Sequence, residues 1–194
     1  MGINFQDTIV GEHIILSKIS TLDAADIFKW RSGNSGQYLR QPVGYSIKSQ
    51  EEWIKSRPGS EINYIISDKK TNQKVGTIGI YDVNVGDKIA NVGRLLISDE
   101  SLGKSTPYGL EALLLGYDYV FNHMDFRKLT GDIVAKNAAM FKLQIFLGMK
   151  EEGYLKKHVF INGEYEDLHV MSIFKDEFND NYKRKIKFLL KGFK

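Results

Sequence analysis

The spacing of apolar residues along the chain alternates between the period of a strand and the period of a helix. Three β-rich runs in the middle of the chain are separated by short polar turns at Lys69–Gln73 and Val83–Lys88. Runs of this kind, joined by short turns, are typical of a meander of antiparallel strands. We therefore predict neighbouring strands over Asn63–Asp68, Lys74–Tyr81 and Ile89–Ser98.

Helical spacing is clearest in the segment that follows these strands. Thr106 is a good N-cap, and Pro107 suits the first helical position, where a backbone N–H is not needed. Apolar residues then recur at the i, i+3, i+4, i+7 spacing of one helix face. They are Leu110, Leu113, Leu114, Tyr117, Val120 and Phe121. The pattern predicts a helix over residues 107–122.

The rest of the chain carries weaker signals of the same two kinds. A helix is expected from Asn137 to Leu147, ended by Gly148, and another from Thr21 to about Arg31. A third short helix would start at the capping box formed by Ser49 and Glu52.

Four more strands complete the predicted order. They are expected over 12–18, 129–134, 149–158 and 168–174. Asn162-Gly163 is a strong hairpin turn between the last two. The order β-α-α-β-β-β-α-β-α-β-β predicts one α/β (α+β) domain over residues 1–176, followed by a basic amphipathic tail over 177–194.

Composition excludes several classes of protein. Apolar residues make up 42% and charged residues 26% of the 194, which is typical of a globular domain with a real core. No cysteine is present, so disulfides and thiolate metal sites are excluded, and the histidines lack ligand-like spacing, so we expect no metal. A net charge of +3 is too small to indicate nucleic acid binding. Without a transmembrane run or a signal-peptide pattern, we expect a cytoplasmic protein.

The stretch from Lys128 to Gly153 carries the strongest functional signal. Asn137 opens its helix, Gly148 and Met149 close it, and Glu152-Gly153 follow. This spacing resembles the acyl-CoA site of the GCN5-related N-acetyltransferases (GNAT). The resemblance implies a mixed, mostly antiparallel central sheet flanked by helices, with the fourth and fifth strands splayed apart. It also implies acetyl-CoA as co-substrate.

The resemblance implies a set of cofactor-binding residues. The N-terminus of the helix that begins at Pro107 would hold the pyrophosphate of CoA, because its free N–H groups and dipole favour an anion. The pantetheine arm would lie along the fourth strand like an extra strand. The residues implied are Leu96, Ile97, Ser98, Lys104, Ser105, Thr106, Tyr108, Gly109, Leu110, Asn137, Phe141 and Gln144.

The proton chemistry departs from the family pattern. Gln144 stands where the family often has a tyrosine acid, and Asn91 stands where many relatives have a glutamate base. If the Val83–Lys88 turn is symmetric, Asp82 lies opposite Asn91 on the same face. Asp82 is therefore our candidate base beside Asn91, and a solvated surface aspartate is the alternative.

Substrate choice is expected to depend on the first helix. The run Phe28-Lys29-Trp30-Arg31 resembles that of enzymes that acetylate 4-amino sugars on a nucleotide carrier. Trp30 would stack on a base or sugar, Arg31 would pair with a phosphate, and Tyr81 would add to the site. Alternatively, Trp30 is a core residue and Arg31 a surface charge. The closing segment also resembles the branch that modifies ribosomal-protein N-termini, so a peptide N-terminus and other small amines remain open.

Two further classes of function remain open. The missing acid and base are compatible with an acyl-CoA-binding domain that does not catalyse transfer. The basic tail over 177–194 could instead be the contact of a structural module. It could touch an anionic surface, but we favour packing on its own domain or on a second subunit, as in a homodimer.

Overall fold

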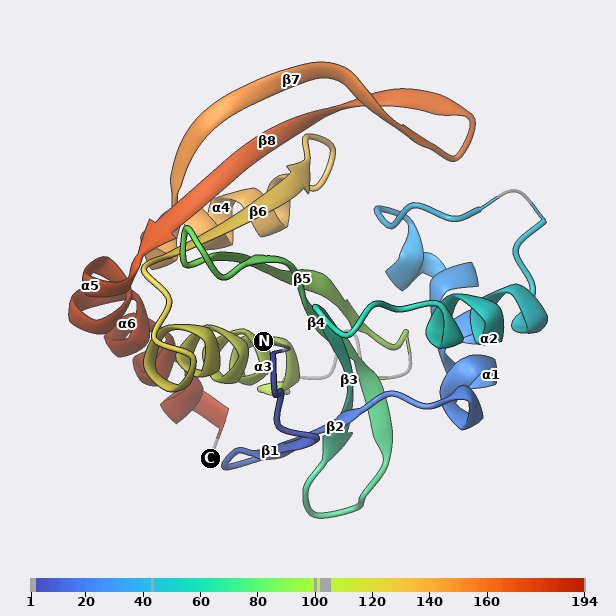
Figure 1. The fold of residues 1–194 in the computed structure, drawn as a ribbon, viewed down its shortest axis with the longest axis horizontal. Helices are drawn as coiled ribbons and strands as arrows, with labels where there is room; N and C mark the ends of the chain where they lie inside the picture. The colour runs from blue at the N-terminus through green and yellow to red at the C-terminus, as the bar shows by residue number, and fades with distance from the viewer. Residues whose placement is uncertain (1–2, 43, 100, 102–105, 194) are drawn as a thin grey trace.

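Eight strands form one mixed sheet in the computed structural model, which describes residues 3–42, 44–99, 101 and 106–193. The strand order is β1-β2-β3-β4-β5-β6-β8-β7, and only β5 and β6 run parallel as neighbours. This confirms the expected mixed, mostly antiparallel sheet (Figure 1). The strands are β1 (Thr8–Val10), β2 (Ile14–Lys18), β3 (Ile62–Asp68), β4 (Lys74–Asn84), β5 (Ile89–Ile97), β6 (Lys128–Val134), β7 (Lys150–Ile161) and β8 (Glu164–Phe174).

The helices gather in two groups on either side of the sheet (Figure 1). Helices α1 and α2 lie together on one side, whereas α3 lies on the other with the C-terminal helices, and the β7–β8 hairpin arches above the sheet. The helices are α1 (Ala24–Ser32), α2 (Ile47–Lys55), α3 (Tyr108–Asp118), α4 (Ala138–Leu147), α5 (Lys175–Glu177) and α6 (Lys183–Leu190).

The predicted ends agree with the structure for α4, whereas the predicted start of α2 does not. Helix α4 is capped by Asn137 and ends at Gly148, whose φ of 121° is costly for any residue with a side chain, as predicted. Helix α2 instead begins after Ser46, whose hydroxyl accepts a hydrogen bond from the N–H of Ser49. The capping box predicted from Ser49 and Glu52 is therefore wrong by one helical turn.

Strands β5 and β6 separate soon after they begin. They pair at three positions, Ile89 with Lys128, Ala90 with Leu129 and Asn91 with Thr130. In the described part of the chain, β5 beyond Asn91 pairs with β4 alone and β6 beyond Thr130 pairs with β8 alone. The predicted splay is confirmed, and it leaves one edge of each strand without a partner strand.

The C-terminal segment packs on α3. A short helical turn over Phe178–Tyr182 precedes α6. Phe178, Tyr182 and Ile186 are fully buried at four-residue spacing, and they belong to the same hydrophobic cluster as the buried face of α3. This amphipathic segment therefore turns its apolar face toward its own domain and leaves its lysines outside.

Candidate active site

The splay exposes the backbone of β5 toward β6. The N–H of Ser98 donates to the carbonyl of Val75 at 2.8 Å, so it points toward β4. Because neighbouring residues of a strand direct their N–H groups to opposite edges, the N–H of Ile97 is directed toward the splay. Leu96 is buried with Trp30 in a hydrophobic cluster. Of the three residues predicted to contact the pantetheine arm, Ile97 is thus the one with a backbone donor at the open edge.

The N-terminus of α3 lies beside the end of β5. A Cβ atom added at Gly109 would lie 3.6 Å from Cγ1 of Ile97, so the first turn of the helix passes close to the strand there. Leu110 packs on the main core cluster. Tyr108 donates to Asp68 at 2.8 Å, and burial together with this contact raises the pKa of Tyr108 to about 12. The N-cap of α3 is Pro107 and no side chain caps the helix, so the cap predicted at Thr106 is wrong by one residue.

Two residues of the predicted cofactor turn, Lys104 and Ser105, lie outside the described residues.

Helix α4 places its predicted residues in separate surroundings. Asn137 accepts a hydrogen bond from the N–H of Met140 at 3.2 Å and so caps the helix. The ring of Phe141 stacks on His169, with centroids 4.0 Å apart. Gln144 is buried, and its side-chain oxygen accepts a hydrogen bond from Tyr182 at 3.0 Å. Gln144 therefore links α4 to the C-terminal segment.

A cavity of about 440 Å³ lies between α1, α2 and the sheet. Both splayed strands line it, with Arg94 from β5 and with Asp132 and Val134 from β6, so the cavity crosses the splay. The β7–β8 hairpin closes it on one side, and the hairpin tip is held by a hydrogen bond from Asn162 to the carbonyl of Gln37 at 3.2 Å. The charged and aromatic lining residues are Arg31, Tyr38, Arg40, Tyr45, Trp53, Tyr81, Asp82, Arg94 and Asp132.

Asp82 and Asn91 meet at the rim of this cavity. The predicted pairing of residue 82 with residue 91 is wrong by one position, because Asn91 pairs with Tyr81 and the register then shifts. Asp82 takes up the irregularity with a φ of 49°. Its carboxylate still accepts a hydrogen bond from the side chain of Asn91 at 3.0 Å. Thr130 of β6 donates to the same side chain, so Asn91 bridges β4 and β6 at the last paired position before the splay.

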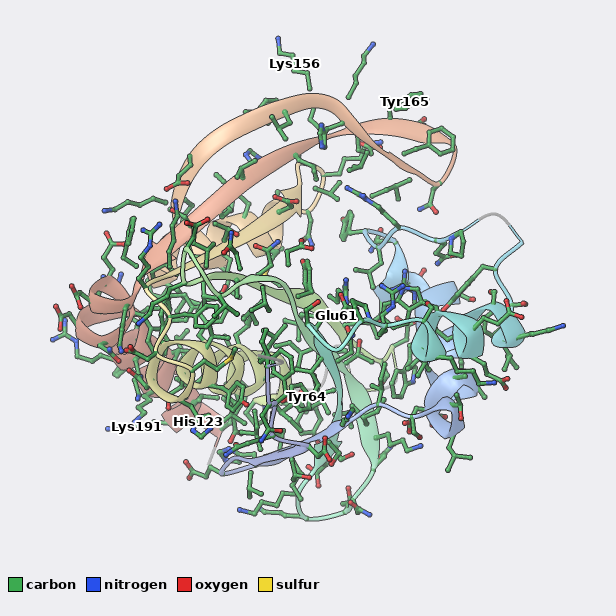
Figure 2. The ribbon with its side chains drawn as sticks, in the orientation of Figure 1. Glu61, Tyr64, His123, Lys156, Tyr165 and Lys191 are labelled. Atoms are coloured by element: carbon green, nitrogen blue, oxygen red, sulfur yellow. The ribbon has the colours of Figure 1, made fainter. Side chains whose placement is uncertain are left out.

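Arg94 is held by an ion pair on the cavity wall. It occupies a bulge in β5 with a φ of 52°. Its guanidinium donates to both carboxylate oxygens of Glu61, at 3.0 and 3.2 Å, and lies 4.0 Å from the centroid of Tyr81. Burial raises the pKa of Glu61, but Arg94 and Arg57 outweigh it and hold the pKa below its ordinary value. Glu61 lies between the sheet and α2 (Figure 2).

Arg31 lines the same cavity from the last turn of α1. One of its terminal nitrogens donates to the carbonyl of Arg40, and its guanidinium carbon lies 5.8 Å from the ring centroid of Tyr45. Burial lowers the pKa of Arg31, and the charge of Arg94 lowers it further, while Tyr45 opposes the shift.

Of the other two predicted substrate residues, Tyr81 lines the cavity and Trp30 does not. Burial raises the pKa of Tyr81 to about 12; Asp132 and Asp82 add to the rise, whereas Arg94 opposes it. Tyr81 lines the cavity, but Trp30 does not; Trp30 is 6% exposed and packs with Ile27 and Ile65. The alternative interpretation, in which Trp30 is a core residue, therefore describes it correctly.

Sequence reasoning missed several lining residues. Trp53, Arg94 and Asp132 come from α2, β5 and β6, and their distances along the sequence give no sign that they share a cavity. The i, i+2 alternation of Thr130 and Asp132 on β6 is the one usable signal, since it places both on one face of that strand.

The described part of the chain shows neither a metal-binding cluster nor a membrane-spanning helix. No group of three or more histidine and acidic side chains is arranged there to hold a metal ion. Among the same residues, none of the helices has the length and apolar character needed to cross a bilayer.

Sequence comparisons identify relatives of one kind. Residues 13–150 match the family described as Acetyltransferase (GNAT) domain. Spermidine N(1)-acetyltransferase of Vibrio cholerae serotype O1 is 24% identical over 61% of this chain and 66% of its own length, just under two thirds. The Bacillus subtilis protein named Probable N-acetyltransferase YjcK is 22% identical over 84% of this chain and 94% of its own.

Solved structures share the fold. Spermidine N-acetyltransferase from Vibrio cholerae, in complex with CoA and spermine, superposes with a TM-score of 0.77 at 21% identity, covering 88% of this chain and all of that one. A GCN5-related N-acetyltransferase from Brucella melitensis gives a TM-score of 0.80 at 16% identity, covering 96% of this chain and 86% of that one.

Proposed function

The chain belongs to the GNAT family of acetyltransferases, and from that premise we propose that its acceptor is a small-molecule amine bound in the cavity across the splay. We further propose that this acceptor is the amino group of a nucleotide-linked amino sugar. The general activity is that of the family, so the expected N-acetyltransferase with acetyl-CoA as co-substrate is confirmed. The choice of acceptor is the proposal.

The position of the cavity supports a small-molecule amine as the acceptor. The cavity is lined by residues of β5 and β6, the two strands that separate at the splay. The N–H of Ile97 is available to a ligand at the open edge of β5. The N-terminus of α3 lies against the same residue, so its free N–H groups lie at the end of that edge. An extended amide chain along β5 and an anion at α3 therefore fit the residues present, and the cavity lies beside them.

The chemistry needs few groups from the protein. Acetyl-CoA, when bound, supplies a thioester whose carbonyl carbon accepts the amine nitrogen while the CoA thiolate leaves. The N–H of Ile97 is suited to stabilise negative charge at the carbonyl oxygen. The ammonium of the acceptor must first lose a proton, and Asp82 is the proposed acceptor of that proton, directly or through water. Holding amine and thioester together supplies much of the rate enhancement, with effective molarities of ~10⁵ M or more.

Asp132 is a second carboxylate at the same end of the cavity. It projects from β6 two residues beyond Thr130, which contacts Asn91. Two aspartates beside the splay would attract an ammonium group, so this end of the cavity is the proposed place for the amine.

A polyamine is the second candidate acceptor. Both the sequence comparison and the structure comparison match a protein from Vibrio cholerae that is named for acetylation of spermidine. The carboxylates of Asp82 and Asp132 are compatible with a cationic substrate as well. The free amino group of a peptide N-terminus is a third candidate acceptor, supported by the sequence of the closing hairpin alone.

Release of the CoA thiol separates these candidates. The chain contains no cysteine, so a thiol reagent reports CoA without background from the protein. We expect saturable release with acetyl-CoA and a nucleotide-linked 4-amino sugar. Turnover confined to peptides or spermidine would replace the proposed acceptor, and saturable CoA binding without turnover across all amines would indicate a binding domain.

A further inference from the structure

The cavity is lined by both acidic and basic side chains. The carboxylates of Asp82 and Asp132 come from the strands beside the splay. Arg31 and Arg40 come from α1 and the segment that follows it. An acceptor in the cavity therefore has carboxylates beside the splay and the guanidinium of Arg31 beside α1.

Arg94 and Arg31 differ in whether an acidic side chain neutralises them. Arg94 is neutralised by Glu61, whose carboxylate is 7% exposed and takes two hydrogen bonds from it. Arg31 forms no ion pair with any of the described residues. Its Nε is the one buried side-chain nitrogen or oxygen for which the described residues supply no hydrogen-bond partner.

A buried guanidinium donor without an acceptor is costly to maintain. Moving a charged donor out of water without giving it a hydrogen-bond acceptor costs free energy. Buried donors without an acceptor are therefore uncommon in proteins unless a ligand binds them. Burial is the main cause that lowers the pKa of Arg31, and Tyr45 opposes this shift more strongly than Arg94 adds to it. An oxyanion would satisfy Nε and pair with the buried charge, because guanidinium matches carboxylate and phosphate geometry.

We propose that Arg31 binds an anionic group of the acceptor, a phosphate or a carboxylate, and thereby selects anionic amines over polyamines. The inference rests on the proposed function in one respect, namely that the cavity holds the acceptor. It places the amine of the acceptor beside Asp82 and its anion beside Arg31. A polyamine would instead bring a second ammonium group toward Arg31, where the like charges repel.

Matched acceptors test the selection without any mutation. CoA release is measured with two pairs of acceptors that differ by one anionic group, glucosamine 6-phosphate against glucosamine and glycine against methylamine. Spermidine is measured beside both pairs. We expect the anionic member of at least one pair to have a KM roughly 10- to 100-fold lower, as for a charge-assisted hydrogen bond. The pair that responds distinguishes phosphate from carboxylate. Equal KM values within both pairs, or a preference for spermidine, would overturn the proposal while leaving the acetyltransferase activity intact.

Substitution of Arg31 then assigns the effect to this side chain. Arg31→Gln should raise KM for the anionic acceptor to the value of its neutral partner and leave kcat nearly unchanged. Arg31→Lys keeps the charge without the planar fork, so it should recover part of the difference. Lys156→Gln, on the outer side of the hairpin (Figure 2), is the matched control for loss of a positive charge. A KM that responds equally to the substitutions at Arg31 and Lys156 would contradict the assignment.

A binding measurement separates this inference from the proposed function. Phosphoethanolamine is titrated by calorimetry into protein saturated with CoA, so that the phosphate site at α3 is already occupied. Wild type should bind it, Arg31→Lys should bind it more weakly, and Arg31→Gln should not. Binding that is equal in all three would refute the anion site, whereas binding lost at Arg31 without turnover of any amine would refute only the proposed function.

Discussion

The C-terminal segment is predicted to be an integral part of the fold, and replacing Phe178 with Ala tests this. Phe178 is fully buried, and its ring centroid lies 5.1 Å from that of Phe121 and 6.1 Å from that of Tyr117, both on the α3 side of the core. It also contacts Tyr182, which holds Gln144 of α4. The segment therefore ties together the two helices whose N-termini border the proposed cofactor site.

The expected loss of stability follows from the burial. Truncation of a fully buried phenylalanine to alanine costs about 3–5 kcal/mol, since it removes apolar contact and leaves a cavity. A domain of this kind has a total stability of only about 5–15 kcal/mol. The Phe178→Ala substitution should thus remove a large part of it. Phe188, in the same segment, is 74% exposed, and Phe188→Ala should change stability by no more than about 0.5 kcal/mol.

Urea denaturation followed by circular dichroism measures both variants against wild type. The expected result is a much lower midpoint for Phe178→Ala with an unchanged slope, and a midpoint near that of wild type for Phe188→Ala. A loss below about 1 kcal/mol at Phe178, or equal losses at both positions, would refute the packing argument.

Three further substitutions probe the site. Asp82→Asn should lower kcat and flatten its rise with pH, and a wild-type pH profile would exclude Asp82 as the base. Asn137→Ala removes the cap of α4, at about 1 kcal/mol, and should raise KM for acetyl-CoA; an unchanged KM would remove Asn137 from the cofactor site. The pKa of Glu61 lies below its ordinary value, so pairing with Arg94 stabilises the fold above the unfolded-state pKa and is lost as pH falls through the folded-state pKa. The difference in unfolding free energy between wild type and Glu61→Gln should therefore shrink in acid, and a difference independent of pH would contradict this.

The parts of the fold set by local sequence were predictable. Asn137 and Gly148 mark the two ends of α4 because a side-chain cap and a positive φ each depend on a single residue. The apolar stripe of α3 identified the helix face that packs on the sheet. The splay of β5 from β6 followed from resemblance to a family rather than from any periodicity.

The cavity was less predictable because non-local register and packing build it. A bulge displaced Asp82 by one position relative to Asn91, and turn length alone does not reveal such a shift. Trp30 and Arg31 are adjacent in sequence, yet helical geometry directs one into the core and the other to the cavity. Arg94 reaches the cavity through a strand irregularity that has no clear signature in the sequence.

The central claim is that an amine bound across the splay receives the acetyl group. Initial rates of CoA release, measured with a nucleotide-linked 4-amino sugar as the varied substrate, test it most directly. The account predicts saturable, acetyl-CoA-dependent release and a KM that rises when the same amino sugar lacks its nucleotide. Saturable binding of acetyl-CoA with no release above hydrolysis, for this acceptor and for every other amine tried, would contradict it.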